Sequence, residues 1–116
     1  MKRQLAEFRG RRAEAFAAWW LRFHGWRILG RRIRVAGGEV DIVARRWRTL
    51  AFVEVKARAT PEAASVSLDA WRLRRVVTAA ERLAPRYLKP GDAVRIDAIF
   101  IVPGRRPCHV PNVWHA

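Results

Sequence analysis

Apolar residues near the start of the chain recur at spacings close to 3.6 residues, the period of an α-helix. These residues are Leu5, Phe8, Phe16, Trp19 and Phe23. The pattern predicts a helix over residues 3–24, and Gly25 is its predicted stop because glycine is common just past a helix end. Glu14 falls on the opposite face of the helical wheel, among side chains that are small or apolar. Both faces of this helix are therefore candidates for burial.

The residues that follow alternate between apolar and polar side chains, as strands do. Residues 26–35 predict a short, irregular strand, and a glycine pair after it signals a turn. Residues 39–44 and 50–57 then predict two strands of a hairpin, joined by a five-residue basic connection around Trp47. Such a hairpin brings the side chains of the two strands next to one another.

The second half of the chain predicts one more helix and one more long strand. The helix runs from about residue 68 to residue 83, with Ser67 as its N-cap and Pro85 marking its far end. Residues 94–102 predict a buried strand, and a short last strand is expected near residues 109–114. The order α-β-β-β-α-β, with an edge strand at the end, predicts a single α/β domain over residues 1–116.

The charge balance points to a polyanionic partner. The formal net charge is +14, from 24 Lys and Arg against 10 Asp and Glu. A domain this basic repels itself unless a polyanion neutralises it, and nucleic acid is the most common such partner. An anionic membrane surface is the rival, but the predicted helices lack the clean division into basic and apolar faces that membrane-surface helices show.

Two features limit the cellular location and the kind of metal site that the sequence predicts. No apolar run reaches the ~20 residues that a transmembrane helix needs, and the first residues are too charged for a signal peptide. Cys108 is the single cysteine, which excludes an internal disulfide and a cysteine-based metal cluster. A bacterial-type cytoplasm is the default location.

Acidic and basic side chains interrupt the predicted hairpin. Glu39 and Asp41 point to one side of the first strand, while Glu54 and Lys56 share a side of the second. If these polar faces meet, carboxylates and one ammonium cluster on an otherwise apolar sheet. Clustered carboxylates repel one another, and a divalent cation such as Mg²⁺ relieves that repulsion. Such a metal activates water and phosphoryl groups, and a nearby lysine can orient the water.

The same residues carry a resemblance to known proteins. Residues 38–41 (GEVD) and 52–56 (FVEVK) resemble the PD-(D/E)xK signature of restriction-endonuclease-like nucleases. Nearly the whole chain resembles the YraN family of small bacterial proteins, which is similar to archaeal Holliday-junction resolvases. Residues 9–18, 38–43, 52–58 and 95–99 carry that match.

The resemblance implies a fold and a site. The fold would be a restriction-endonuclease-like mixed sheet flanked by helices. Asp41 and Glu54 would be ligands of Mg²⁺ or Mn²⁺, Lys56 the catalytic lysine, and Glu14 a further acid reaching the site from the first helix. Two positions depart from the pattern. Val40 stands in place of the signature proline, and Arg72-Leu73 occupies a stretch where relatives often carry a Lys-Gln pair.

Arginines supply the predicted nucleic-acid footprint. The predicted contacts are Arg11, Arg12, Arg45, Arg46, Arg48, Arg58, Arg72 and Arg75. These side chains could grip phosphates, and Trp47 could stack on an unpaired base. For Asp97 and the histidines, a structural role is the main interpretation, with Asp97 holding an arginine or a backbone N–H.

Three functions remain open on these observations. The first is a Mg²⁺- or Mn²⁺-dependent DNA endonuclease, structure-specific for branched or junction DNA. The second is a non-catalytic DNA- or RNA-binding module that retains the nuclease fold. The third is a basic RNA-associated structural protein. A homodimer would suit a symmetric junction, and DNA is the partner that the first hypothesis predicts.

Overall fold

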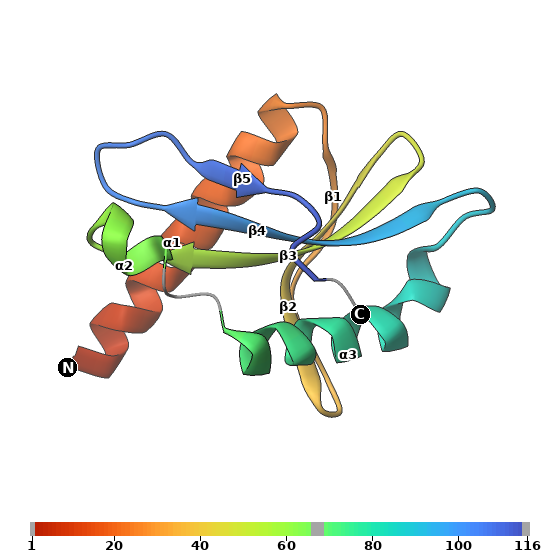
Figure 1. Cartoon of the computed structure of the whole chain (residues 1–116), viewed down its shortest axis with the longest axis horizontal. Coiled ribbons are helices and arrows are strands. Elements are labelled where there is room, and N and C mark those ends of the chain that lie inside the picture. The colour runs from red at the N-terminus through yellow and green to blue at the C-terminus, as the bar shows by residue number, and fades with distance from the viewer. Residues whose placement is uncertain (1, 66–68, 115–116) are drawn as a thin grey trace.

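The computed structural model describes residues 2–65 and 69–114 as five strands and three helices (Figure 1). In chain order the elements are α1 (Lys2–Phe23), β1 (Arg27–Val35), β2 (Gly38–Arg46), β3 (Thr49–Ala57), α2 (Pro61–Ser65), α3 (Ala70–Tyr87), β4 (Ala93–Ile101) and β5 (Cys108–Val110). The predicted α/β architecture, a mixed sheet flanked by helices, is confirmed. None of the helices in these ranges is long and apolar enough to cross a membrane.

The five strands form one sheet in the order β1-β2-β3-β4-β5. All neighbours are antiparallel except β3 and β4, which pair in parallel from Thr49–Ala93 to Ala57–Ile101. A parallel neighbour needs a long crossover connection, and α2 and α3 supply it. β1 is irregular, as predicted, because its register with β2 shifts between Ile28 and Gly30.

Helix α1 packs its small residues, not its aromatic ones, against the sheet. Ala17, Ala18 and Leu21 are fully buried in a core cluster that includes Ile42, Val53 and other side chains of the same sheet face. The aromatic side chains of the opposite helix face are exposed, by 51% for Phe16, 67% for Trp19 and 87% for Phe23. Of the two faces that were candidates for burial, only the one with small side chains is therefore buried. Small side chains allow a close approach of helix to sheet, and among the residues that the structure describes no element buries the aromatic side chains.

The end of α1 follows the predicted glycine stop. Gly25 adopts φ +87°, a conformation that glycine reaches without steric cost. Its N–H donates to the Arg22 carbonyl at 3.1 Å, and the Trp26 N–H donates to the Leu21 carbonyl at 2.9 Å. This pair of bonds is the Schellman motif, which satisfies the last carbonyls of a helix.

Helix α3 covers the opposite face of the sheet. Its buried side chains Leu73, Val76, Ala79, Ala80 and Leu83 join a core cluster with residues of β2, β3 and β4. Gly38 makes this close packing possible, because a Cβ there would lie 2.4 Å from the Arg75 carbonyl oxygen. The glycine before the acidic strand thus brings α3 against that strand.

The boundaries of two loops differ from prediction. β2 extends to Arg46 and β3 begins at Thr49, so the predicted five-residue connection is a two-residue turn of Trp47 and Arg48. Trp47 has φ +55°, which closes a turn of this length. A short helix, α2, begins at Pro61, where only a break was predicted. The Ala63 N–H donates to Thr60 Oγ1 at 3.1 Å and caps it.

Helix α3 also begins and ends differently from prediction. Asp69 is its N-cap, accepting a hydrogen bond of 2.8 Å from the Arg72 N–H. The predicted cap Ser67 lies outside the described residues. Pro85 lies inside the last turn instead of ending the helix, because the Leu88 N–H still reaches the Ala84 carbonyl at 2.7 Å. This cap places Arg72 in the first helical turn.

Candidate active site

Asp41 lies where the hairpin opens. The β2–β3 ladder runs from Arg46–Thr49 to Ile42–Val53 and ends there. The Val55 N–H, two residues beyond the ladder on β3, donates to Asp41 Oδ2 at 2.7 Å. The carboxylate thus satisfies a backbone group that has lost its strand partner, and this bond fixes the side chain in the opening between the strands.

Glu54 and Lys56 project from β3 on the side that α3 covers. Glu54 is 1% exposed and Lys56 is 5% exposed, so both charged groups are buried. Lys56 Nζ lies 3.1 Å from Glu54 Oε1. Arg72, from the first turn of α3, donates through Nη2 to the same oxygen at 2.8 Å. One carboxylate oxygen therefore faces two cations.

Glu14 reaches the same region from α1. It is 5% exposed and lies on the sheet-facing side of the helix, as the helical wheel predicted. Its Oε1 is 3.1 Å from Arg32 Nε and 3.6 Å from Arg31 Nε. These are ion pairs by distance, yet within the described chain this buried oxygen accepts no hydrogen bond. The oxygen is therefore held by the attraction of the two guanidinium charges and not by a hydrogen bond.

The three acids repel one another. The pKa of Asp41 is raised to about 7, first by burial and then by repulsion from Glu54 and Glu14. The hydrogen bond from the Val55 N–H acts in the opposite direction and lowers this pKa. Burial also raises the pKa of Glu14, which the charges of Arg32, Arg31 and Arg11 only partly offset. Two neighbouring carboxyl groups do not readily both lose their protons, because the two negative charges repel. A cation bound between them would offset this repulsion.

A cavity of about 360 Å³ opens beside these acids. It is lined by Gly10, Arg11, Glu14, Arg32, Arg34, Asp41, Val55 and Arg72. Carboxylates therefore form part of its wall while four arginines surround them. Acidic and basic side chains therefore line the same cavity.

The donor set fits a hard divalent cation. Within residues 2–65 and 69–114, no group of three or more His, Cys, Asp or Glu side chains could hold a metal ion, so Glu14 does not form a three-acid metal site with Asp41 and Glu54. Mg²⁺ does not require three protein ligands, because it commonly uses one or two carboxylates and completes its shell with waters and phosphate oxygens. Asp41 and Glu54 are the two carboxylates that would hold such a cation.

Arg72 is more closely involved in the site than the sequence indicated. It was predicted only as a phosphate contact, and the polar side chain expected next to it was missing at Leu73. The structure places Leu73 in the core and directs Arg72 to Glu54. The signal that could have shown this is Asp69, because an N-cap there orients the first turn of the helix.

Several other predicted residues lie elsewhere. Glu39 pairs with Arg34 at 3.6 Å and with Arg75 at 3.9 Å, and so it does not join the carboxylate cluster. Arg45 donates to both carboxylate oxygens of Asp92, at 2.8 and 2.5 Å, and to the Tyr87 carbonyl at 2.8 Å. These bonds give Arg45 a structural role in place of the predicted contact with nucleic acid.

The remaining predicted arginines divide between regions of the surface. Arg11 lines the acidic cavity, whereas Arg12 and Arg58 line a separate groove beside the aromatic face of α1. Arg46 and Arg48 are exposed at the β2–β3 turn. The predicted arginines therefore lie on several separate parts of the surface.

The mixed five-stranded sheet flanked by helices is an α/β fold that a solved structure shares. The chain is similar to the Holliday junction resolvase Hjc of Archaeoglobus fulgidus, with a TM-score of 0.63 and 23% identity over 89% of this chain and 72% of that one. At this identity the likeness concerns the fold.

The family follows from sequence comparison. The chain belongs to the uncharacterised protein family UPF0102, whose model matches residues 13–101. It is 57% identical to a UPF0102 protein of Sphingopyxis alaskensis over 98% of both chains. It is 54% identical to a UPF0102 protein of Rhizorhabdus wittichii over 98% of this chain and 97% of that one. UPF0102 is the YraN family, so the membership predicted from the sequence is confirmed.

Proposed function

We propose that this protein is an endonuclease that hydrolyses DNA phosphodiester bonds with Mg²⁺ or Mn²⁺, and that branched or junction DNA is its substrate class. The observation that carries the proposal is the group formed by the buried Glu14, Glu54 and Lys56 and the partly buried Asp41 at an arginine-lined cavity. If these acids served only to stabilise the fold, the surrounding residues would compensate their charges. Instead, burial and repulsion from Glu54 raise the pKa of Asp41 to about 7.

The carboxylates of Asp41 and Glu54 would hold the cation. A divalent cation bound there supplies a Lewis acid that polarises the phosphate and lowers the pKa of water. The Asp41 side chain is already oriented by the Val55 N–H at 2.7 Å. This bond leaves its second oxygen, Oδ1, free to face the cavity.

Lys56 and Arg72 complete the proposed machinery. Lys56 Nζ lies 3.1 Å from Glu54, within reach of a water or phosphate oxygen next to that carboxylate. Arg72 is 36% exposed at its side chain, so its planar guanidinium can turn from Glu54 to a phosphate. Arg11, Arg32 and Arg34 then face the flanking phosphates from the cavity wall.

The choice of nucleic acid as ligand rests on the charge of the chain, and the preference for branched DNA rests on the structural neighbour. The formal net charge of +14 favours long nucleic-acid ligands over small phosphate esters. The structural neighbour Hjc is a Holliday junction resolvase, and its fold covers 89% of this chain. Both supports concern the substrate class and leave the chemistry of the site as a separate question.

The decisive experiment is cleavage of end-labelled linear duplex, single strand, flap and four-way junction with Mg²⁺, Mn²⁺ or EDTA. Wild type and Asp41→Asn are compared on each DNA. We expect cutting by wild type alone, only with metal, and fastest on a branched DNA. Asp41→Asn keeps DNA binding because it removes a negative charge beside the phosphate. Binding by wild type without cutting under either metal would contradict the catalytic proposal for these substrates.

A non-catalytic binding module is the second candidate, and one observation favours it. Glu54 Oε1 already faces both Lys56 and Arg72, so this acid is neutralised without a metal. In that case metal would not change DNA affinity. Arg72→Ala would weaken binding and Arg74→Ala, on the exposed side of the same turn, would serve as the matched control. Metal-dependent cutting by wild type excludes this candidate.

A further inference from the structure

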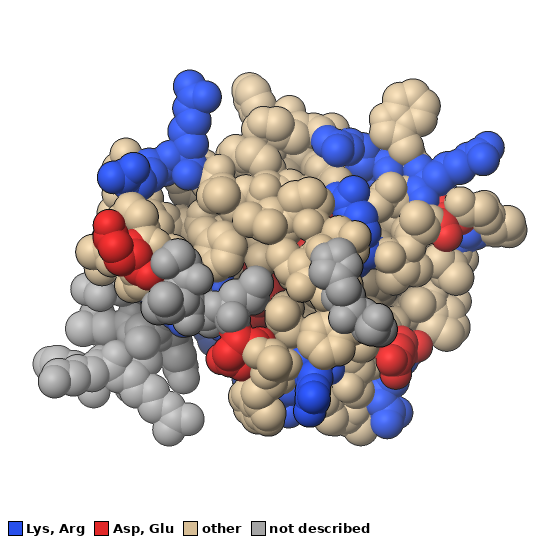
Figure 2. Space-filling view, viewed as in Figure 1, with Lys and Arg blue, Asp and Glu red and all other residues tan. Residues whose placement is uncertain are grey.

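The β2–β3 turn presents an isolated aromatic side chain to solvent. Trp47 is 90% exposed, the largest exposed fraction among the large hydrophobic side chains of the described residues. Figure 1 shows the turn at the upper right, away from the start of α3 at the lower centre, where Arg72 meets Glu54. In Figure 2, Lys and Arg atoms lie on both sides of the projection over this turn. The aromatic group therefore stands apart from the acidic cavity, in a basic environment.

The backbone around Trp47 is held firmly on both sides. Before it, Arg45 is bonded to Asp92, and Arg46 donates to the His24 carbonyl at 3.1 Å. The Arg46 guanidinium also lies over the Trp26 ring, 4.6 Å from its centroid. After it, the Arg48 carbonyl accepts a hydrogen bond of 2.7 Å from the Ala93 N–H. These contacts pre-organise the turn, so binding through Trp47 loses little backbone entropy.

An exposed tryptophan on a rigid basic turn has the chemistry of a base-stacking platform. Every nucleobase has a flat face that an indole can cover, but only an unpaired or unstacked base offers that face. Paired bases inside a duplex expose their edges and keep their faces covered. Arg46 and Arg48 flank Trp47 in the sequence and are exposed. Because the Arg46 guanidinium is held by the His24 carbonyl and the Trp26 ring, Arg48 is the side chain that can contact a phosphate next to such a base.

We propose that Trp47 stacks on an unpaired base of the nucleic acid, and that the β2–β3 turn is a second contact separate from the acidic site. The choice of DNA rests on the proposed function. Asp41 and Trp47 are six strand residues apart, which places the two sites roughly 20 Å from one another. At about 3.4 Å of rise per base, this span corresponds to about six base pairs. The substrate class is therefore a duplex with an unpaired segment about six base pairs from the cut.

Binding in EDTA tests the contact without cleavage. The probes are a labelled blunt duplex and the same duplex with a single-stranded flap that contains 2-aminopurine. We expect Trp47→Ala to weaken binding of the flapped DNA by about tenfold while affinity for the blunt duplex stays within about twofold. Trp47→Phe retains most of the affinity, and wild type, but not Trp47→Ala, quenches the 2-aminopurine.

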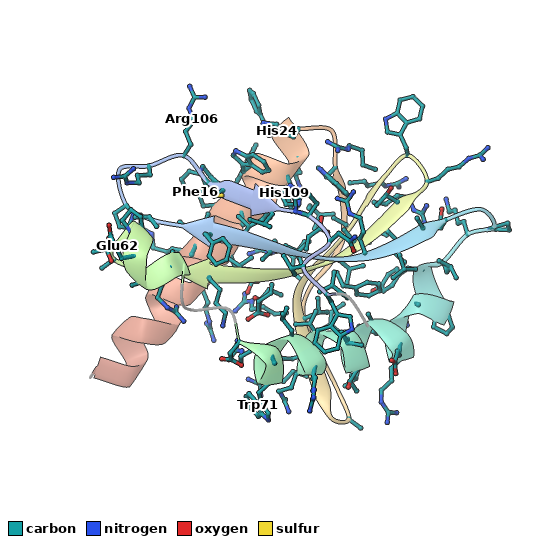
Figure 3. The ribbon with its side chains drawn as sticks, viewed as in Figure 1. Phe16, His24, Glu62, Trp71, Arg106 and His109 are labelled. Atoms are coloured by element: carbon teal, nitrogen blue, oxygen red, sulfur yellow. The ribbon has the colours of Figure 1, made fainter. Side chains whose placement is uncertain are left out.

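Trp71 provides the matched control, since it is 65% exposed at the start of α3 (Figure 3), where the Arg75 guanidinium lies 5.3 Å from its ring centroid. Trp71→Ala should leave the preference for the flap unchanged. Equal losses on both DNAs, or none on either, would overturn the proposal. If the protein cuts DNA but Trp47→Ala binds the flap normally, the stacking proposal fails while the proposed function stands. If wild type binds the flapped DNA through Trp47 but cuts no DNA, the stacking proposal stands while the proposed function fails.

Discussion

Two aspartates on this sheet, the fully buried Asp97 and the partly buried Asp41, have opposite environments. Asp97 on β4 is fully buried, and its carboxylate accepts two hydrogen bonds from Arg95, at 3.1 and 2.8 Å, and one from the Asn112 N–H at 3.0 Å. His109 Nε2 lies 2.8 Å from the same carboxylate. Although burial raises the pKa of Asp97, these contacts of His109, Arg95 and Asn112 lower it below its usual value. Its charge is satisfied within the fold.

Asp41 receives far less compensation. It accepts one hydrogen bond, from the Val55 N–H, while Glu54 and Glu14 add negative charge near it. Its pKa is raised to about 7, first by burial and then by Glu54. The comparison teaches that a buried acid alone does not mark a functional site. The informative observation is a buried acid whose charge the surrounding residues leave uncompensated.

The largest expected effect is on cleavage by Asp41→Asn. Its rate should fall by at least about a thousandfold, because a metal-held phosphate gains several kcal/mol in the transition state. The same variant should melt at a higher temperature than wild type in EDTA at pH 8, since it removes a repelled buried charge. Cleavage rates and melting temperatures of the two proteins check both parts. A destabilised Asp41→Asn would place Asp41 in the same class as Asp97.

Asp97→Asn should show the reverse pattern. The asparagine cannot match the charge of Arg95, so the folded state should lose about 2–3 kcal/mol. Urea titration measures this loss, and cleavage per folded molecule should stay within about threefold of wild type. A large loss of cleavage with unchanged stability would move Asp97 into the active site. That result would break the distinction between the two acids.

The sequence predicted the acids of the site through short-range regularities. Alternation along two strands joined by a turn places Asp41 close to Glu54, and helical periodicity places Glu14 on the face toward the sheet. The contact of Arg72 with Glu54 joins residues 18 positions apart along the chain. It depends on how α3 docks on Gly38, which no local pattern contains.

Other features were predicted only in part. Both faces of α1 were candidates for burial, and only the face with small side chains, which fits closer to the sheet, is buried. Asp97 holds Arg95 and the Asn112 N–H, as predicted. Its contact with His109 of β5 was not predicted, because it depends on how β5 pairs with β4.

The next largest expected effect that separates Asp41 from Asp97 is the stabilisation of the protein by a bound metal ion. Mn²⁺ at about a hundred times its dissociation constant should stabilise wild type by about 2.7 kcal/mol, which raises its melting temperature. Asp41→Asn should show little or none of this increase, whereas Asp97→Asn should show all of it from a lower starting value. Differential scanning calorimetry with Mn²⁺ and with EDTA measures the shift. Equal shifts in wild type and Asp41→Asn would place the cation somewhere else.

The smallest expected effect is the pH dependence of stability without metal, to which the two aspartates contribute with opposite sign. The pKa of Asp97 is lowered, so its stabilisation is present above about pH 4 and is lost as the pH falls through its folded value. The pKa of Asp41 is raised from 3.8 to about 7, so its repulsion appears as the pH rises between these values. The melting temperature in EDTA should therefore pass through a maximum near pH 5 and decline by a few degrees on each side. Asp41→Asn should flatten the alkaline side alone, and Asp97→Asn should weaken the acid side alone. A wild-type curve that keeps rising from pH 5 to pH 8 would show that another group compensates Asp41.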